Sequence, residues 1–243
     1  MTSQPITHHA DGPVAAAIGL LARQGFDATS VDELAEAAGM SRSTFFRKFG
    51  SKEDVVFADH ERILGQVNDR LAHSRLEPLA AVEDAALLVF NHHLRNRETS
   101  RARYELMQAV PALRDRELVT SHRYERAFLL HLLDKLPDGG HGEYQAVAFA
   151  AAVVAVHNAF LRQWLRAGPG AGETAGNAAS ETEAGRGRSA ALAAELQALS
   201  ALFRPALLGN TAAAQPSPTV IVTVLGAGAD KDAVAQAVRD ALP

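Results

Sequence analysis

The sequence predicts an all-α protein in which an N-terminal domain of three short helices is followed by a larger helical bundle. Apolar residues recur at steps of three and four over most of the first 208 residues, which is the period of amphipathic helices. Serine and glycine stand in the N-terminal part at positions typical of helix starts and ends. Apolar residues make up 47% of the chain and cysteine is absent, so we expect a core that needs no disulfide.

The N-terminal part predicts three short helices and then a long one. Ser30 and Glu33 have the spacing of a capping box, in which each side chain bonds the other residue's backbone N–H. Gly39 permits the positive φ of a tight turn between the second and third helices, so the pair has the form of a helix-turn-helix. The predicted segments are 12–24, 30–38, 41–49 and 51–74.

The rest of the chain predicts a bundle and a tail. Helices are expected over 78–94, 101–110, 118–136, 143–166 and 190–208. Residues 168–188 are small, polar and glycine-rich, which favours a flexible loop. Beyond a linker, the β-branched run 219–225 predicts a strand and 232–242 a short helix. We therefore divide the chain into residues 1–52, 53–208 and 209–243, the last of unknown role.

The charge distribution points to one local surface rather than to the whole chain. The formal net charge is −4, which is not the overall signature of a nucleic-acid-binding protein. Between Met40 and Lys52, however, there are four basic residues and no acidic one. The N-terminus has no apolar stretch of the signal-peptide kind, and no uncharged apolar run reaches the roughly 18–20 residues of a membrane span. We expect a cytoplasmic protein without membrane contact.

The stretch GFDATSVDELAEAAGMSRSTFFRKFGSKEDVV closely resembles the DNA-binding domain of TetR-family regulators. The resemblance is strong over residues 14–57 and looser, resting on helix order and length, to about residue 208. It implies a homodimer that binds a palindromic operator in double-stranded DNA and responds to a small apolar or amphipathic effector. The DNA-contacting residues that it implies, together with helix position, are Thr29, Arg42, Ser43, Thr44, Phe46, Arg47, Lys48 and Lys52.

One of these positions departs from the family pattern. The family usually has a tyrosine where Phe46 stands, and that tyrosine's hydroxyl binds a phosphate. Phenylalanine cannot donate this bond. We expect Phe46 to remain near the sugar–phosphate surface, with Lys48 compensating for the lost contact.

The effector pocket is expected among side chains of the bundle, although the same residue types are typical of a plain core. The candidates are Phe90, His93, Tyr104, Met107, His122, Phe128, His157, Phe160 and Trp164. His157 is equally expected at a dimer interface. Arg101 and Arg103 are expected on a solvated face, with binding of an anionic head group as the alternative.

The resemblance, together with these residues, implies a ligand-responsive homodimeric repressor. The alternatives are a ligand-dependent activator and a DNA-binding regulator whose bundle is filled by side chains. The sequence has no nucleophile–base motif, metal-spaced cluster or phosphate loop, so we expect neither an enzyme nor a cofactor or metal.

Overall fold

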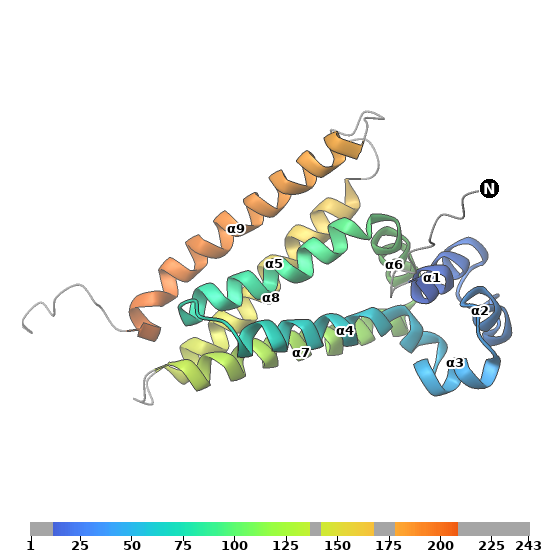
Figure 1. Ribbon diagram of the computed structural model, residues 1–243, viewed down its shortest axis with the longest axis horizontal. Coiled ribbons are helices and arrows are strands. Elements are labelled where there is room, and N and C mark those ends of the chain that lie inside the picture. Colours follow the sequence, from blue (N-terminus) through green and yellow to red (C-terminus); the bar gives the residue numbers. More distant parts are fainter. Residues whose placement is uncertain (1–11, 137–141, 168–177, 209–243) are drawn as a thin grey trace, which may run out of the picture. The chain divides into compact units, whose positions relative to one another are not determined.

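Helices account for all the secondary structure that the structure describes, which confirms the all-α prediction (Figure 1). The computed structural model describes residues 12–136, 142–167 and 178–208, which lie within one compact unit of residues 1–209. The predicted strand and helix of the 209–243 tail lie outside the described residues. The helices are α1 Gly12–Gln24, α2 Val31–Ala37, α3 Arg42–Phe49, α4 Lys52–Ala72, α5 Pro78–Arg95, α6 Arg97–Ala109, α7 Pro111–Lys135, α8 Glu143–Arg166 and α9 Ala178–Leu208.

Local capping defines the first three helix starts after α1. The Ser30 hydroxyl accepts the backbone N–H of Glu33 at 3.2 Å, and the Glu33 carboxylate accepts the N–H of Ser30 at 2.7 Å. This is the predicted capping box. The hydroxyls of Ser41 and Ser51 cap α3 and α4. Each accepts the backbone N–H of the residue three positions later in the chain. Gly39 has φ 68°, so the turn between α2 and α3 uses the conformation that glycine adopts most readily.

The described residues pack around two clusters of buried apolar side chains. The first, here called the N-terminal core, joins α1, α2, α3 and the start of α4 to three residues of α6 and α7. The second, the bundle core, lies between α4, α5, α7, α8 and α9. Helix α4 is long enough to take part in both, since Val55 and Val56 belong to the first cluster and Ile63 and Val67 to the second.

Two helix starts differ most from the sequence prediction. The loop predicted over 168–188 is wrong in its second part, because α9 begins at Ala178 and continues through Gly185 and Gly187. Single glycines cost about 1 kcal/mol each in a helix, which the packing of a long helix against its neighbours can offset. Helix α7 begins directly at Pro111 rather than near Leu118, with proline at the first helical position, where its missing N–H costs nothing.

Two helices, Glu143–Arg166 and Glu183–Leu208, are long and apolar enough to cross a membrane when judged by length and composition alone. The buried helices of a folded bundle pass the same test. Phe149 and Val153 of the first and Leu192 and Leu196 of the second are fully buried in the bundle core. The apolar content of both helices is therefore accounted for in part by packing within the protein.

Candidate DNA-binding surface and ligand cavity

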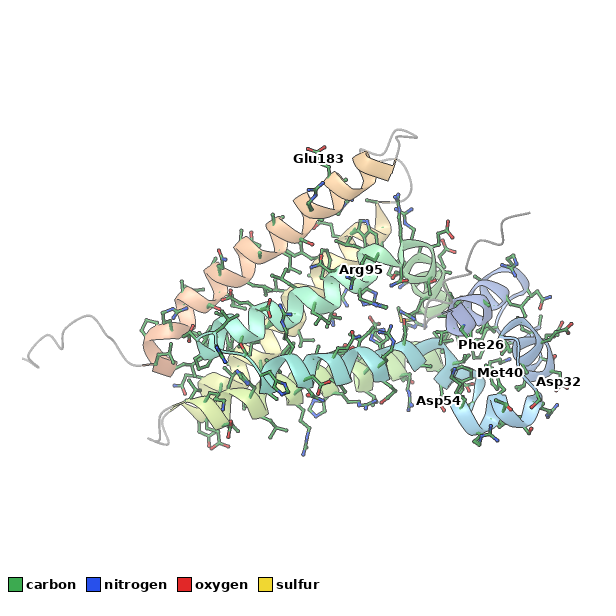
Figure 2. All side chains as sticks on the ribbon, viewed as in Figure 1. Phe26, Asp32, Met40, Asp54, Arg95 and Glu183 are labelled. Carbon is green, nitrogen blue, oxygen red and sulfur yellow. The ribbon has the colours of Figure 1, made fainter. Side chains whose placement is uncertain are left out.

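Helix α3 presents most of the predicted DNA-contacting side chains to solvent. Its apolar side is fixed by Phe45 and Phe49, which are buried in the N-terminal core with ring centroids 5.0 Å apart. The opposite side carries Ser43, Arg47 and Lys48, all exposed. Figure 2 shows the domain that holds α3, with Phe26, Asp32 and Met40 labelled around it and Asp54 in the first turn of α4.

Arg42 and Phe46 form a small exposed assembly at the start of α3. The Arg42 guanidinium lies 5.5 Å from the Phe46 ring centroid and donates to Asp32 of α2 at 2.7 Å. Phe46 itself is 41% exposed. The Asp32 carboxylate thus holds the guanidinium beside the ring, while the arginine side chain stays 61% exposed. Thr44 is half-buried, and its N–H is engaged by the Ser41 cap.

Two of the predicted phosphate contacts, Thr29 and Lys52, form hydrogen bonds within the protein. Thr29 is 1% exposed, and its hydroxyl donates to the Gly25 carbonyl at 2.7 Å, so the hydroxyl faces the protein. The Lys52 ammonium donates to the carbonyl oxygens of Phe26 and Thr29 at 2.6 and 3.2 Å and lies 4.4 Å from the Phe26 ring centroid. Lys52 therefore fastens the α1–α2 loop to the first turn of α4.

A cavity of about 70 Å³ lies between α4, α5, α6, α7 and α8. It includes four of the nine predicted pocket residues, His93, Met107, Phe128 and His157. The other lining residues, which were not among the nine predicted, come from all five helices: Phe57, His60, Ala86, Val89, Ser100, Arg103, Glu117, Thr120, Ser121, Tyr124, Val154, Asn158, Leu161 and Leu165.

The other five predicted pocket residues lie outside the cavity lining. Phe90 is fully buried behind it, with its ring centroid 5.9 Å from that of His157. Phe160 packs against the bundle core. Tyr104 accepts a hydrogen bond from Arg166 near the surface, and the His122 side chain is 76% exposed beside Glu125. Trp164 is buried, with the Arg101 guanidinium 6.0 Å from its ring centroid.

A buried charge network lies in the cavity wall between α4 and α6. Arg103, expected on a solvated face, is only 3% exposed, which corrects that expectation. Its Nη2 donates to both carboxylate oxygens of Asp59 at 2.7 Å, and its Nε donates to the Val56 carbonyl at 2.8 Å. Burial alone would raise the pKa of Asp59, but the Arg103 guanidinium and a hydrogen bond from His92 hold that pKa well below its usual range. Asp59 is therefore ionised and compensated.

The sequence carried a signal for this network that the prediction did not use. In α4 the apolar stripe passes through Val56, Ile63 and Val67, and one turn of that stripe is occupied by Asp59 and His60. Polar residues inside an apolar stripe indicate either a buried pair or a site. The pairing partner, 44 residues away in the chain, was not visible from the sequence.

Three cavity histidines are uncharged at neutral pH. Burial lowers the pKa of His60 and of His157 to about 4, and burial with the neighbouring His60 and Arg103 lowers the pKa of His93 well below its usual value. His60 and His93 lie with ring centroids 5.5 Å apart, and His93 and His157 6.4 Å apart. Within the described ranges no group of three or more His, Cys, Asp or Glu residues has the arrangement of a metal site.

A protein-family comparison places a match in the N-terminal part of the chain. Residues 14–58 match the family described as "Bacterial regulatory proteins, tetR family". Over 77 residues the chain is 42% identical to the putative mycofactocin biosynthesis transcriptional regulator MftR of Mycobacterium tuberculosis, covering 31% of this chain and 38% of the relative. It is 29% identical over 77 residues to the fatty acid metabolism regulator protein of Bacillus subtilis, covering 32% and 40%. Each match thus spans about two fifths of the curated relative.

Solved structures match over more of the chain but with low identity. The repressor NalD of Pseudomonas aeruginosa has 15% identity and a TM-score of 0.48, covering 82% of this chain and 96% of that one. The TetR-family regulator PfmR of Thermus thermophilus has 18% identity and a TM-score of 0.42, covering 75% and 97%.

Proposed function

Because the chain belongs to the TetR family of bacterial regulatory proteins, we propose that it is a cytoplasmic transcriptional regulator that binds an operator in double-stranded DNA through α3. The observation that carries this proposal is the exposed basic face of α3, fixed on its other side by Phe45 and Phe49. Ser43, Arg47 and Lys48 offer short and charged donors on an element that fits the major groove. Arg42 becomes a further donor to DNA when the Asp32 carboxylate releases or shares the Arg42 guanidinium.

We propose that two copies act together on a palindromic operator, with their α3 helices about 34 Å apart along the DNA. Exposed apolar side chains on α8 and α9 support a dimer: Tyr144 and Val147 of α8 are 82% and 45% exposed, and Leu202 of α9 is 77% exposed. Sedimentation should give a dimer for the wild-type chain and a monomer for the variant Val147→Glu with Leu202→Glu. Leu118→Glu, at a 69% exposed position of α7, is the matched control.

We further propose that the cavity receives a small effector and that Phe57 and Met107 transmit its binding. Both line the cavity, and both belong to the N-terminal core that holds α1, α2 and α3. The cavity in this conformation is too small for a drug-sized molecule, which needs several hundred Å³. An effector must therefore enlarge it, and it shifts the protein away from DNA only by binding the enlarged form better.

DNA binding is tested first by fluorescence anisotropy, with the DNA that lies upstream of the protein's own gene, across a salt series. The wild type should bind tightly, with affinity falling steeply as salt rises, because charged contacts to phosphate release counterions. Arg47→Ala should abolish specific binding, whereas Arg126→Ala, an exposed arginine of α7, should bind like the wild type. Salt-insensitive binding, or equal binding by both variants, would contradict the assignment of α3.

The small cavity volume also favours a second candidate, a regulator that needs no effector. Enlarging the Ala86 side chain by Ala86→Leu distinguishes the two, since Ala86 lines the cavity and is buried. Effector binding is supported if an added compound releases the wild type, but not the Ala86→Leu variant, from the operator of a reporter gene. The ligand-independent regulator is supported if neither protein is released from that operator under any condition.

A further inference from the structure

Several of the cavity's hydrogen-bond donors are already used by protein acceptors. All three nitrogens of Arg103 are engaged, by Asp59, by the Val56 carbonyl and, at 3.4 Å, by the His60 ring. The hydroxyl of Thr120 donates to a backbone carbonyl of its own helix, and that of Ser100 donates to the His93 carbonyl. A ligand that brings only acceptors, such as a carboxylate, therefore finds few partners here.

His157 offers an acceptor without a partner. Its side chain is buried, and its pKa of about 4 makes the ring neutral at neutral pH, with one nitrogen protonated. Nδ1 lies 3.1 Å from Asn158 Oδ1, and the Asn158 amide donates to Ser121 Oγ at 3.1 Å, so the amide oxygen accepts the Nδ1 proton. The remaining nitrogen, Nε2, is then an acceptor that is buried and has no partner among the described side chains. A buried acceptor of this kind calls for a donor from outside the protein.

Glu117 supplies the second free acceptor. It lines the same cavity from α7, half-buried, with no hydrogen bond or ion pair in the described part of the chain. Burial raises the pKa of the Glu117 carboxyl, and the Arg162 guanidinium, which lies outside the cavity lining, opposes this. The other charges of the lining cancel, because Arg103 is neutralised by Asp59 and the histidines His60, His93 and His157 are uncharged. The cavity lining therefore has unused hydrogen-bond acceptors. The Glu117 carboxylate gives the lining its remaining negative charge.

From these acceptors we infer the chemical class of the effector: an amphipathic amine. Its ammonium group donates to the Glu117 carboxyl and to His157 Nε2, and its apolar body packs against Phe57, Met107 and Phe128. Met107 is the adaptable part of this wall, because an unbranched thioether side chain fills spaces of irregular shape. This inference rests on the proposed effector-binding function, and it predicts that fatty acids and other apolar carboxylates bind more weakly than amines.

The inference is tested by isothermal titration calorimetry of the full chain with decylamine, decanol and decanoate, which share one apolar chain and differ in the polar end. Decylamine should bind most tightly and decanoate at least about tenfold more weakly, the order expected when a charged hydrogen bond is lost and like charges meet. Glu117→Gln should reduce decylamine affinity at least about tenfold while decanol affinity stays unchanged. Asp115→Asn, an exposed carboxyl two residues away on α7, is the matched control and should bind all three like the wild type.

Decanoate binding as tight as decylamine, or a Glu117→Gln variant that keeps its full preference for the amine, overturns the inference. His157→Phe removes the second acceptor while keeping a ring, and it should weaken both decylamine and decanol; unchanged binding of both overturns the role of His157. All variants are first checked for an unaltered melting temperature.

DNA binding is measured separately by anisotropy without ligand. A chain that binds DNA but prefers decanoate disproves the amine inference alone. A chain that binds amines but no DNA disproves the regulator proposal alone.

Discussion

The surface of α3 and the lining of the cavity use charged residues in opposite ways. On α3, Arg47 and Lys48 are exposed and leave their charges for a partner. At the cavity, Arg103 and Asp59 are 3% and 4% exposed and neutralise each other. An exposed cation costs the fold little and can be removed at little cost in stability, whereas a buried one is tolerated only with its partner. The two regions should therefore respond oppositely to the same kind of substitution.

The largest expected effect is the loss of one member of the buried pair. Arg103→Met leaves the Asp59 carboxylate without its main partner, and Asp59→Leu leaves the guanidinium uncompensated. Each should lower the free energy of unfolding by about 3–5 kcal/mol, and the double variant by much less, because no uncompensated charge remains. Chemical denaturation of the four proteins measures this, with Arg47→Ala as a control that should stay within about 0.5 kcal/mol of the wild type. Equal losses in the single and double variants would show that packing, not charge, is what Arg103 contributes.

The next largest effect should come from protonation of the buried cavity histidines on acidification. The pKa of His60 and of His157 is about 4 in the folded protein and about 6.5 when unfolded, so below pH 6.5 the unfolded chain takes up protons that the folded chain does not. Stability is therefore intact above pH 7 and falls as pH decreases from 6.5 toward 4. By pH 5.5 the two histidines together should cost about 3 kcal/mol.

The pH dependence is measured as urea unfolding free energies from pH 7.5 to 4.5. The variant His157→Phe should have a shallower decline than the wild type, since one of the titrating groups is gone. The exposed His122 is the control: His122→Gln should leave the slope unchanged. A wild-type slope no steeper than that of His157→Phe would contradict the assignment of a neutral buried His157.

How far each region could be predicted follows from the range of its interactions. The caps of α2 and α3 join Ser30 to Glu33 and Ser41 to Thr44, three residues apart, so their sequence pattern is sufficient. The exposed basic face needs only helical period and the burial of an apolar side. The cavity joins five helices, and its partners are far apart in the chain. An aromatic residue such as Phe90 looks the same in a sequence whether it lines a cavity or packs behind it, so periodicity alone could not separate the two.

The capping box offers a smaller test of the predictable region. Ser30→Ala removes the acceptor for the Glu33 N–H and should lower the free energy of unfolding by about 1 kcal/mol. Ser189→Ala is the comparison, because the Ser189 hydroxyl of α9 bonds the Asn91 side chain and caps no helix. If the two variants lose equal stability, the cap is not what fixes the start of α2. DNA affinity should fall only in proportion to any loss of folded protein, because Ser30 lies outside α3.

The smallest expected effect concerns the exposed ring of Phe46. Phe46→Tyr adds one hydroxyl to a side chain that is 41% exposed, so stability should not change. If the ring lies beside the sugar–phosphate surface, the hydroxyl gains one hydrogen bond to phosphate, and operator affinity should rise about threefold to tenfold. The slope of affinity against salt should stay the same, because no charge is added. Lys48→Ala is the informative contrast: it should lower both the affinity and the salt slope, the latter by about one. An unchanged affinity for Phe46→Tyr would place the ring away from phosphate and leave its stacking with Arg42 as the reason for its exposure.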